Sequence, residues 1–98
     1  MGLEFEWDAS KAKLNWLKHR VGFDEAIAVF RDPLAKLFDD PDHSEAEGRS
    51  LAVGHSANRL LVVSFTERRG RIRLISARCA TRRERGDYEQ ASSERRVR

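Results

Sequence analysis

The spacing of apolar residues changes at Asp32-Pro33, and this change limits the possible folds more than any other feature of the chain. Before this point, apolar side chains recur at intervals of three and four residues, which is the period of a helix. After it, they alternate with polar residues or form continuous runs, as they do in strands. Proline marks the boundary because the residue before it avoids the helical region. The sequence therefore predicts helices followed by strands, an order typical of an α+β domain.

Two helices are predicted before this boundary. Asp8 is a good N-cap for a first helix that runs to about residue 19 or 20. A second, short helix opens at Asp24-Glu25, where acidic side chains suit the positive end of the helix dipole. The apolar residues expected to face the core are Leu14, Leu17 and Val21 in the first segment and Phe23, Ile27 and Phe30 in the second.

Four strands are predicted after the boundary, at residues 34–38, 49–55, 59–66 and 71–78. The run 59–66 is β-branched and apolar on both faces, which indicates a central strand. Residues 67–70 have the composition of a turn. Thr81 and Glu84 form a capping box for a last helix that begins near Arg82. The predicted fold is therefore two N-terminal helices, a four-stranded antiparallel sheet and a C-terminal helix.

The chain has 98 residues, which is enough for one domain with a modest core. We expect this domain to span residues 1–90, because residues 91–98 lack apolar periodicity and favour a frayed or disordered tail. No stretch approaches the roughly 20 apolar residues of a membrane span, and the first residues lack the layout of a signal peptide. We therefore expect a cytoplasmic protein without membrane contact. The single cysteine, Cys79, excludes an internal disulfide and is expected to be inert.

Charge is distributed unevenly along the chain. Residues 1–58 carry 7 Lys and Arg against 11 Asp and Glu, whereas residues 59–98 carry 12 Arg, no Lys, and 5 Asp and Glu. Arginine binds phosphate through a planar pair of N–H donors, so this bias favours contact with RNA or DNA. Two alternatives stay open: the arginines only solvate a sheet face and a helix, or they form a surface that receives an acidic protein partner.

Several arginines fall on neighbouring strands or turns and could converge on one face or edge of the sheet: Arg49, Arg59, Arg68, Arg71, Arg73 and Arg78. Cleavage of RNA needs a base for the 2′-OH proton, cations that stabilise the phosphorane, and an acid for the leaving 5′-oxygen. His43 and Glu47 are candidates for proton transfer, with His55 in reserve, although a polar loop also explains the segment that holds the first two. No spacing of His and Cys suggests a metal, and no cofactor is expected.

Motifs spread over residues 5–89 resemble those of one known family. The first group is Phe5-Glu6-Trp7-Asp8, Lys11-Ala12, Asn15, Lys18-His19, Phe23-Asp24-Glu25-Ala26, Val29-Phe30 and Asp32-Pro33. The second group is His43-Ser44-x-x-Glu47-x-Arg49, Gly54-x-Ser56, Arg59-Leu60-Leu61-Val62-Val63, Thr66-x-Arg68, Ile72-Arg73-Leu74-Ile75-Ser76-Ala77-Arg78-x-Ala80-Thr81, Glu84-Arg85 and Tyr88-Glu89. Together they resemble the BrnT-type toxins. Two positions depart from that pattern, since Arg20 and Asn58 stand where the family usually has glycine.

The resemblance implies a RelE-like fold and the toxin of a bacterial type II toxin–antitoxin pair. It implies a ribonuclease that cleaves mRNA and inhibits translation, and we interpret this chain as a metal-independent endoribonuclease. It also implies an antitoxin with a ribbon-helix-helix domain, which neutralises the toxin and represses the shared operon. The toxin would then contact operator DNA only through the antitoxin, in a hetero-oligomer.

On this interpretation, the candidate catalytic residues are Arg49, Arg68 and Arg78 for phosphate binding and His43 and Glu47 for proton transfer. The candidate RNA-binding residues are Arg59, Arg73 and His55. RelE-like enzymes can also use arginines and lysines in place of a conventional acid–base pair. Two alternatives to an enzyme stay open. One is a module that binds nucleic acid without cutting it and acts as an operator co-repressor, and the other is a protein-interaction module for an acidic antitoxin segment.

Overall fold

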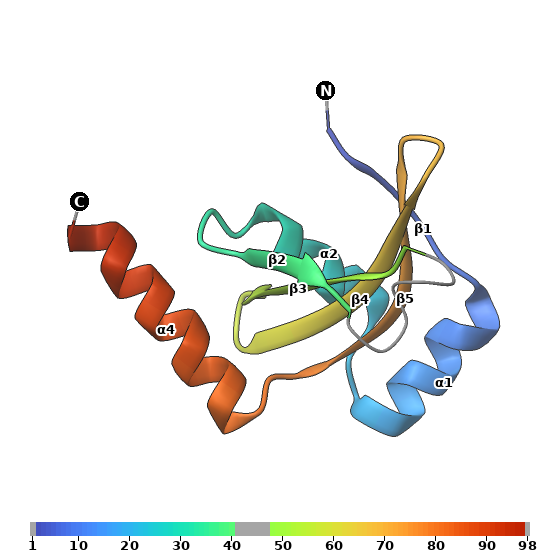
Figure 1. Ribbon diagram of the computed structural model, residues 1–98. Coiled ribbons are helices and arrows are strands. Elements are labelled where there is room, and N and C mark those ends of the chain that lie inside the picture. The colour runs from blue at the N-terminus through green and yellow to red at the C-terminus, as the bar shows by residue number, and fades with distance from the viewer. Residues whose placement is uncertain (1, 41–47, 98) are drawn as a thin grey trace.

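The computed structural model describes residues 2–40 and 48–97, with side chains described as far as Ala91. The elements follow in the order β1 (Glu4–Glu6), α1 (Ala9–His19), α2 (Phe23–Ile27), the 3-10 helix η1 (Ala28–Arg31), β2 (Lys36–Asp39), β3 (Ser50–His55), β4 (Leu60–Arg68), β5 (Arg71–Cys79) and α4 (Arg82–Val97). Helices α1 and α4 lie at opposite ends of the sheet (Figure 1). The predicted α+β class is confirmed.

The sheet has five strands in the order β1-β5-β4-β3-β2. Strand β1 runs parallel to β5, with Glu4 opposite Arg71 and Glu6 opposite Arg73, whereas the other neighbouring strands are antiparallel. The prediction of a four-stranded antiparallel sheet is therefore wrong. A three-residue strand is too short for alternation to show, and its partner lies far along the chain, so no local signal marks β1.

The N-terminal helices follow the prediction in position but not fully in length. Helix α1 begins after Asp8, whose Oδ1 accepts a hydrogen bond from the Lys11 N–H at 3.0 Å. It ends at Arg20, which adopts the left-handed conformation with φ 57°. These observations confirm the predicted start and end of the first helix. In the second predicted helix only five residues are α-helical, in α2. The rest of the segment continues as the 3-10 helix η1, which ends at Arg31.

Helix α1 contacts the sheet through a polar residue. Leu14 and Leu17 are 65% and 56% exposed, whereas Asn15 is buried. The Asn15 amide donates to the carbonyls of Val21 and Ala77 and accepts from the Ala77 N–H, at 2.9–3.0 Å. The predicted apolar face is thus wrong for Leu14 and Leu17. Strand β1 covers only the start of β5, and Asn15 supplies the partner that the backbone of Ala77 needs beyond it.

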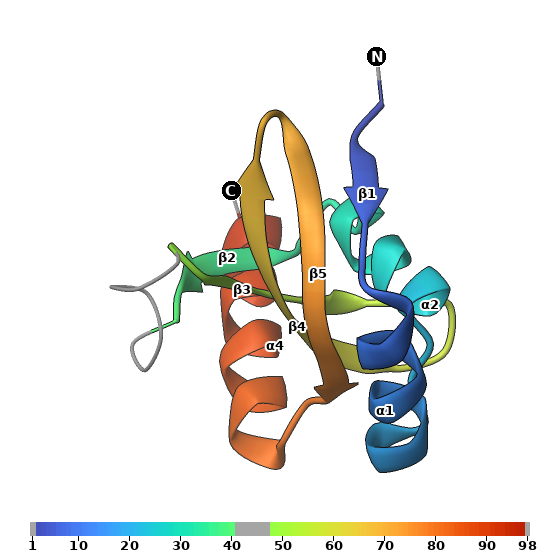
Figure 2. The ribbon, with the colours of Figure 1, turned by 90° about the vertical axis from the view of Figure 1, so that its right-hand side faces the viewer.

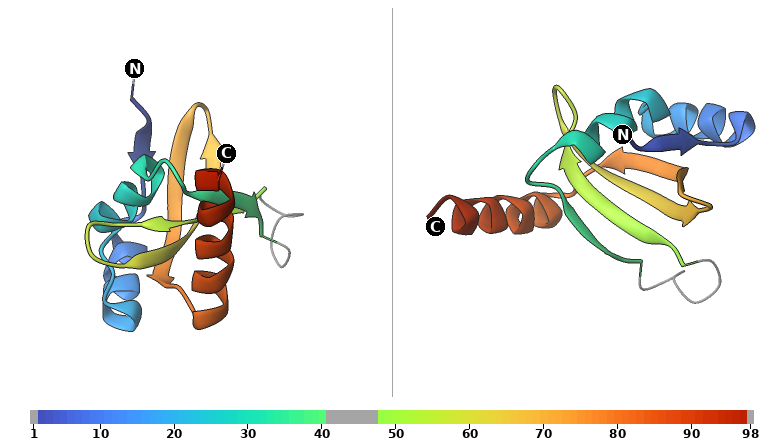
Figure 3. Two further views of the ribbon diagram at one scale, coloured as in Figure 1. Left: turned by 90° about the vertical axis from the view of Figure 1, so that its left-hand side faces the viewer. Right: turned by 90° about the horizontal axis from the view of Figure 1, so that it is seen from above.

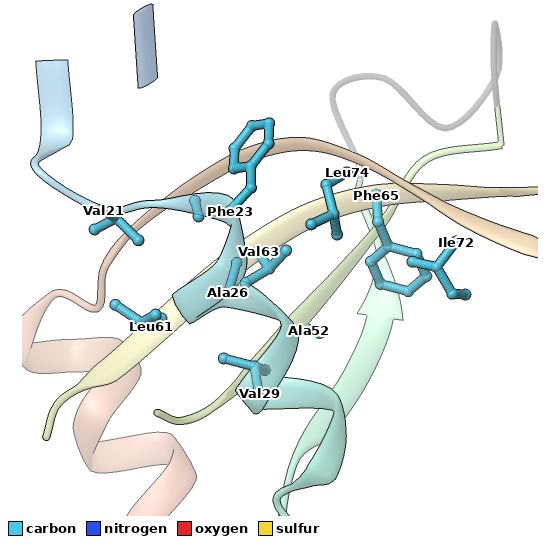
Figure 4. Close-up of a cluster of buried hydrophobic side chains, with 11 residues drawn as sticks. Val21, Phe23, Ala26, Val29, Ala52, Leu61, Val63, Phe65, Ile72 and Leu74 are labelled. Carbon is cyan, nitrogen blue, oxygen red and sulfur yellow. The ribbon is translucent and has the colours of Figure 1, made fainter. Parts of the chain in front are cut away.

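The larger apolar cluster, drawn in Figure 4, joins α2 and η1 to one face of β3, β4 and β5. Its β4 members are Leu61, Val63 and Phe65. On the other face of β4, Leu60 and Val62 pack with Tyr88 of α4 in a second cluster. Because β4 is buried on both faces, the prediction of a central strand in this segment is confirmed.

Helix α4 covers only one end of the second face, and α1 and α2 lie on the other side of the sheet (Figure 3). The Glu84 N–H donates to Thr81 Oγ1 at 3.2 Å and Glu84 Oε1 accepts from the Thr81 N–H at 2.8 Å, which confirms the capping box.

The end of α4 differs from the sequence-based expectation. The sequence favours a frayed or disordered tail over residues 91–98, but the backbone is helical as far as Val97. The domain boundary at residue 90 stays a prediction. Within the described residues, no helix combines the length and the apolar character needed to cross a membrane.

Candidate phosphate-binding site

A pocket of about 360 Å³ opens near the tip of the β4–β5 hairpin. We call it the basic pocket, and its described lining consists of Lys11, Arg49, Thr66, Arg68, Arg73 and Ile75. It therefore brings together three of the arginines predicted from the sequence, Arg49, Arg68 and Arg73. These residues come from α1, from the start of β3 and from β4 and β5, so the pocket exists only in the folded chain.

The register of the β4–β5 ladder explains why the arginines converge. Thr66 lies opposite Arg73, and Arg68 lies opposite Arg71. Residues opposite one another project from the same face of a sheet, and alternate residues of a strand share a face. These four side chains therefore share the face opposite to the α2–η1 core. At this end of the sheet α4 does not cover that face, so a ligand can approach it.

Arg49 and Lys11 reach the pocket from two other elements. Arg49 directly precedes Ser50, the first residue of β3, which pairs with Phe65. Because β3 and β4 are antiparallel, Arg49 adjoins Thr66, the residue that follows Phe65 in β4. Lys11 lies one helical turn before Asn15, so both residues lie on the same side of α1, at the edge of β5. The contact between α1 and this edge is what brings an ammonium group to the pocket.

The basic pocket is strongly cationic. Its described lining offers three guanidinium groups and one ammonium group, and no carboxylate. Arg73 Nη1 is 3.3 Å from Glu6 Oε2, whereas Arg68 has no ion pair within residues 2–40 and 48–91. Such a group of donors suits the oxygens of a phosphate.

One lining residue carries a further indication of a ligand. Thr66 is 6% exposed, and its Oγ1 has no hydrogen-bond partner among the described residues. A buried polar atom without a partner costs about 1–3 kcal/mol, so a bound oxygen at this position would restore a lost interaction. The hydroxyl is therefore a polar group in the wall of the basic pocket that a bound water or a ligand oxygen would satisfy.

Arg78 lies outside the lining of this pocket. Its Nη1 and Nη2 donate to Glu84 Oε1 and Oε2 at 2.8 and 2.9 Å, which joins β5 to the start of α4. The hydrogen bonds from Arg78 lower the pKa of Glu84 to about 2. A catalytic role for Arg78 stays a prediction, and the pairing favours a structural one.

Arg59 has an equally complete set of partners. Its Nε and Nη2 donate to Glu25 Oε2 and Oε1 at 2.9 and 2.7 Å, and Nη2 also donates to the Arg20 carbonyl at 2.7 Å. Hydrogen bonds to the Glu25 carboxylate raise the pKa of Arg59 above its ordinary value. Arg59 therefore holds the start of β4 to α2, and its predicted contact with RNA remains untested.

His55 lies at the same end of the sheet as Arg59. The Nδ1 atom of His55 is 3.2 Å from the Tyr88 hydroxyl. That hydroxyl donates to Asp32 Oδ2 at 2.6 Å, and the backbone N–H of His55 donates to the same Oδ2 at 2.8 Å. Burial raises the pKa of Asp32, but these hydrogen bonds and one from the Leu34 N–H outweigh burial and lower it. This cluster fastens α4 to the sheet, away from the basic pocket.

The two residues predicted to move protons, His43 and Glu47, lie outside the described residues. Their roles stay predictions. They belong to the segment that joins β2 to β3 and that precedes Arg49.

Two polar lining residues, Lys11 and Thr66, are not among the predicted site residues. Lys11 falls on the polar side of α1 by its spacing, so only the position of that helix at the sheet edge reveals it. Thr66 stands at the end of an apolar run and resembles an ordinary strand residue. The position of Thr66 beside Arg73 could still be predicted from the sequence, because a hairpin turn at Arg69-Gly70 places residue 66 opposite residue 73.

The fold and the basic pocket define a small α+β protein with a cationic site, suited to phosphate, on one face of its sheet. A family model described as the ribonuclease toxin, BrnT, of the type II toxin–antitoxin system matches residues 7–84. The chain therefore belongs to the BrnT family of ribonuclease toxins, which confirms the resemblance seen in the sequence. A search among curated proteins finds no significant match.

Proposed function

We propose that the protein is a metal-independent endoribonuclease that cleaves mRNA and inhibits translation, with the basic pocket as its active site. The observation that carries the proposal is the convergence of Lys11, Arg49, Arg68 and Arg73 around the buried Thr66 hydroxyl. Membership of a family of ribonuclease toxins supports RNA as the substrate.

The proposed reaction is an attack of the 2′-oxygen on the neighbouring phosphorus. A base removes the proton from the 2′-OH, the new bond to phosphorus forms, and the bond to the 5′-oxygen breaks. Arg49, Arg68 and Arg73 stabilise the charge on the phosphoryl oxygens, because their donors surround the pocket before the reaction begins. Lys11 donates a proton to the leaving 5′-oxygen, since an ammonium group has protons to give.

The base in this scheme is His43 or Glu47, which we retain as proposals. Arg78 also stays a proposed phosphate ligand, but it would first have to release Glu84, to which it is bound through two hydrogen bonds. We therefore expect Arg68 to contribute more to the reaction than Arg78.

Metal independence is supported by the charge of the pocket. Divalent cations in phosphoryl-transfer sites are held by carboxylates, and the described lining of the basic pocket contains none. Four cationic side chains would also repel a metal ion. Cleavage of RNA in the presence of EDTA tests this part of the proposal directly.

We also propose that the partner is an antitoxin with a ribbon-helix-helix domain. In this proposal the two proteins form a hetero-oligomer in the cytoplasm that represses their operon, and the toxin contacts operator DNA only through the antitoxin. The family supports the existence of an antitoxin. A neighbouring open reading frame for such a protein, and its co-purification with the toxin, would support the proposal. A partner of another fold would contradict it.

The main experiment measures cleavage of a labelled single-stranded RNA by the purified protein in EDTA. We expect Arg68→Ala to reduce the rate by about 10²-fold, the usual effect of losing one donor that stabilises a developing charge. Arg83→Ala is the matched control, because Arg83 is an exposed arginine on α4 outside the pocket. Equal rates for both variants would overturn the assignment, and RNA binding without cleavage would favour the non-catalytic alternative.

A further inference from the structure

The tip of the β4–β5 hairpin carries a second cationic pocket of about 490 Å³. We call it the tip pocket, and its described lining consists of Glu6, Arg68, Arg69, Arg71 and Arg73. Figure 2 shows the hairpin tip beside β1, the strand that contributes Glu6. Arg68 and Arg73 line both pockets, so the two pockets adjoin. A chain of phosphates could therefore pass from one pocket to the other.

The backbone at the tip is unfavourable for the residue that it carries. Arg69 and Gly70 form the two-residue turn of the hairpin, with φ values of 53° and 78°. Turns with two positive φ angles favour Asn-Gly, because a non-glycine residue other than Asn or Asp is strained there. An arginine at this position lowers the stability of the turn and adds a fourth guanidinium to the tip pocket. An arginine that lowers the stability of its own turn and lines a cationic pocket indicates that its charge contributes to binding a ligand.

The carboxylates that face these arginines hold them loosely. Arg71 Nε is 3.4 Å from Glu4 Oε1 and Arg71 Nη1 is 3.8 Å from Glu6 Oε1, while Arg73 Nη1 is 3.3 Å from Glu6 Oε2. The Arg71 and Glu4 side chains are 56% and 65% exposed. By contrast, the Arg59–Glu25 pair is closed at 2.7 Å. The Arg73 and Glu6 side chains are 34% and 30% exposed, much like Arg59 and Glu25, but their hydrogen bond is longer, at 3.3 Å. Long contacts of this kind contribute little stability, so another anion can replace the carboxylates.

We propose that the tip pocket is a second phosphate-binding subsite for RNA, and that Glu6 occupies it until the RNA displaces the carboxylate. This inference rests on the proposed ribonuclease function of the adjoining basic pocket. Glu6 bridges Arg71 and Arg73, which is the position that a phosphate would take between two guanidinium groups. The carboxylate therefore competes with RNA and keeps the affinity of the free protein for polyanions low.

The test compares two variants that remove the same charge from the same hairpin region. Glu6→Gln removes the competing carboxylate. Glu67→Gln is the matched control, because Glu67 is exposed but lies between Thr66 and Arg68 and so points to the other face of β4. The probe is a 12-nucleotide RNA with 2′-O-methyl groups, which cannot be cleaved, and its affinity is measured by fluorescence anisotropy at several salt concentrations.

We expect Glu6→Gln to tighten binding about two- to fivefold, the range of an exposed ion pair, and Glu67→Gln to change it less. Arg69→Asn should weaken binding and reduce the magnitude of the salt slope by about 0.7, as for one lost phosphate contact on a single strand. The same variant should raise Tm by about 2–6 °C, because asparagine suits the turn. Opposite changes in affinity and stability would show that Arg69 serves RNA and not folding.

Equal affinities for Glu6→Gln and the wild type, or equal gains in Glu6→Gln and Glu67→Gln, would overturn the inference. If the wild type cleaves RNA under those circumstances, the proposed function stands and only the second subsite falls. If the wild type neither binds nor cleaves RNA, the proposed function falls as well. A gain in antitoxin affinity without a gain in RNA affinity would also overturn it, in favour of a protein ligand at the tip.

Discussion

Arg59 directly precedes β4 and Arg68 ends it, roughly 30 Å apart at the usual rise of a strand. At the first position, the guanidinium binds both Glu25 oxygens and a backbone carbonyl at 2.7–2.9 Å. At the second, the guanidinium has no ion pair among the described side chains and lines two adjoining pockets. Arginine on a strand is therefore not by itself a sign of RNA binding. Arg59 is bound within the fold, whereas Arg68 is available for the proposed contact with RNA.

The rest of the molecule follows the same division. The Arg59 end carries α4, the Asp32–His55–Tyr88 cluster and the paired Arg78, all of which fasten one element to another. The Arg68 end carries the basic pocket and the tip pocket, where cations exceed carboxylates. Changes at the Arg68 end should therefore alter RNA cleavage, and changes at the Arg59 end should alter stability.

An effect as large as that of Arg68→Ala is expected for Lys11→Ala. Loss of the proton donor should lower the cleavage rate by about 10²-fold, within the usual range for general acid catalysis. Lys13→Ala is the control, because Lys13 is exposed on the same helix and does not line the basic pocket. The measurement is the single-turnover cleavage rate of a labelled RNA. Similar rates in the two variants would remove Lys11 from the mechanism and weaken the assignment of the pocket.

The next effect is expected at the opposite end, in Tyr88→Phe. This variant keeps the buried ring but removes the hydroxyl that donates to Asp32. A hydrogen bond to a charged group contributes about 1.5–3 kcal/mol, so we expect a loss of that size in the free energy of unfolding in urea. The cleavage rate of the folded variant should not change. A slower reaction at unchanged stability would place the cluster in the active site instead.

The smallest effect is expected for the Arg78–Glu84 pair and depends on pH. The pKa of Glu84 is lowered from 4.5 to about 2, so the pair stabilises the fold fully above about pH 4.5 and loses this effect as pH falls toward 2. Because the Arg78 side chain is 39% exposed, we expect the contribution to be only about 1 kcal/mol. Glu84→Gln should remove it at pH 7 while the capping box survives.

Urea unfolding of Glu84→Gln at pH 7 and pH 3 checks this prediction, with Glu89→Gln as the control on an exposed position of α4. The difference in stability between the wild type and Glu84→Gln should shrink at the lower pH. An equal difference at both pH values would show that the ion pair is not the source of the effect.

Local signals in the sequence are sufficient for much of the fold. The Asp8 cap, the Thr81–Glu84 capping box and the β-branched run of β4 each act within a few residues, and the structure confirms all three. Two features depend on distant partners and are missed. Strand β1 pairs with a strand near the other end of the chain, and Asn15 is buried because the backbone of β5 needs its amide.

The candidate site divides in a similar way. Arg68 and Arg73 can be placed together from sequence, because the hairpin register follows from a turn at Arg69-Gly70. Lys11 cannot, because its place in the pocket depends on how α1 meets the sheet edge. The partner of Arg59 is also hidden in the sequence, since Glu25 lies 34 residues away. Charge content identifies the arginines, and only the tertiary contacts separate those that hold elements of the fold together from those that line the pockets.

The most direct test compares Arg68→Ala with Arg59→Ala in one experiment that records both Tm and the cleavage rate of the folded protein in EDTA. We expect Arg68→Ala to lose about 10²-fold in rate with an unchanged Tm. Arg59→Ala should lower Tm, because it leaves the Glu25 carboxylate without its guanidinium, and should keep the wild-type rate. A loss of cleavage in Arg59→Ala equal to that in Arg68→Ala would contradict the division between the two ends of β4.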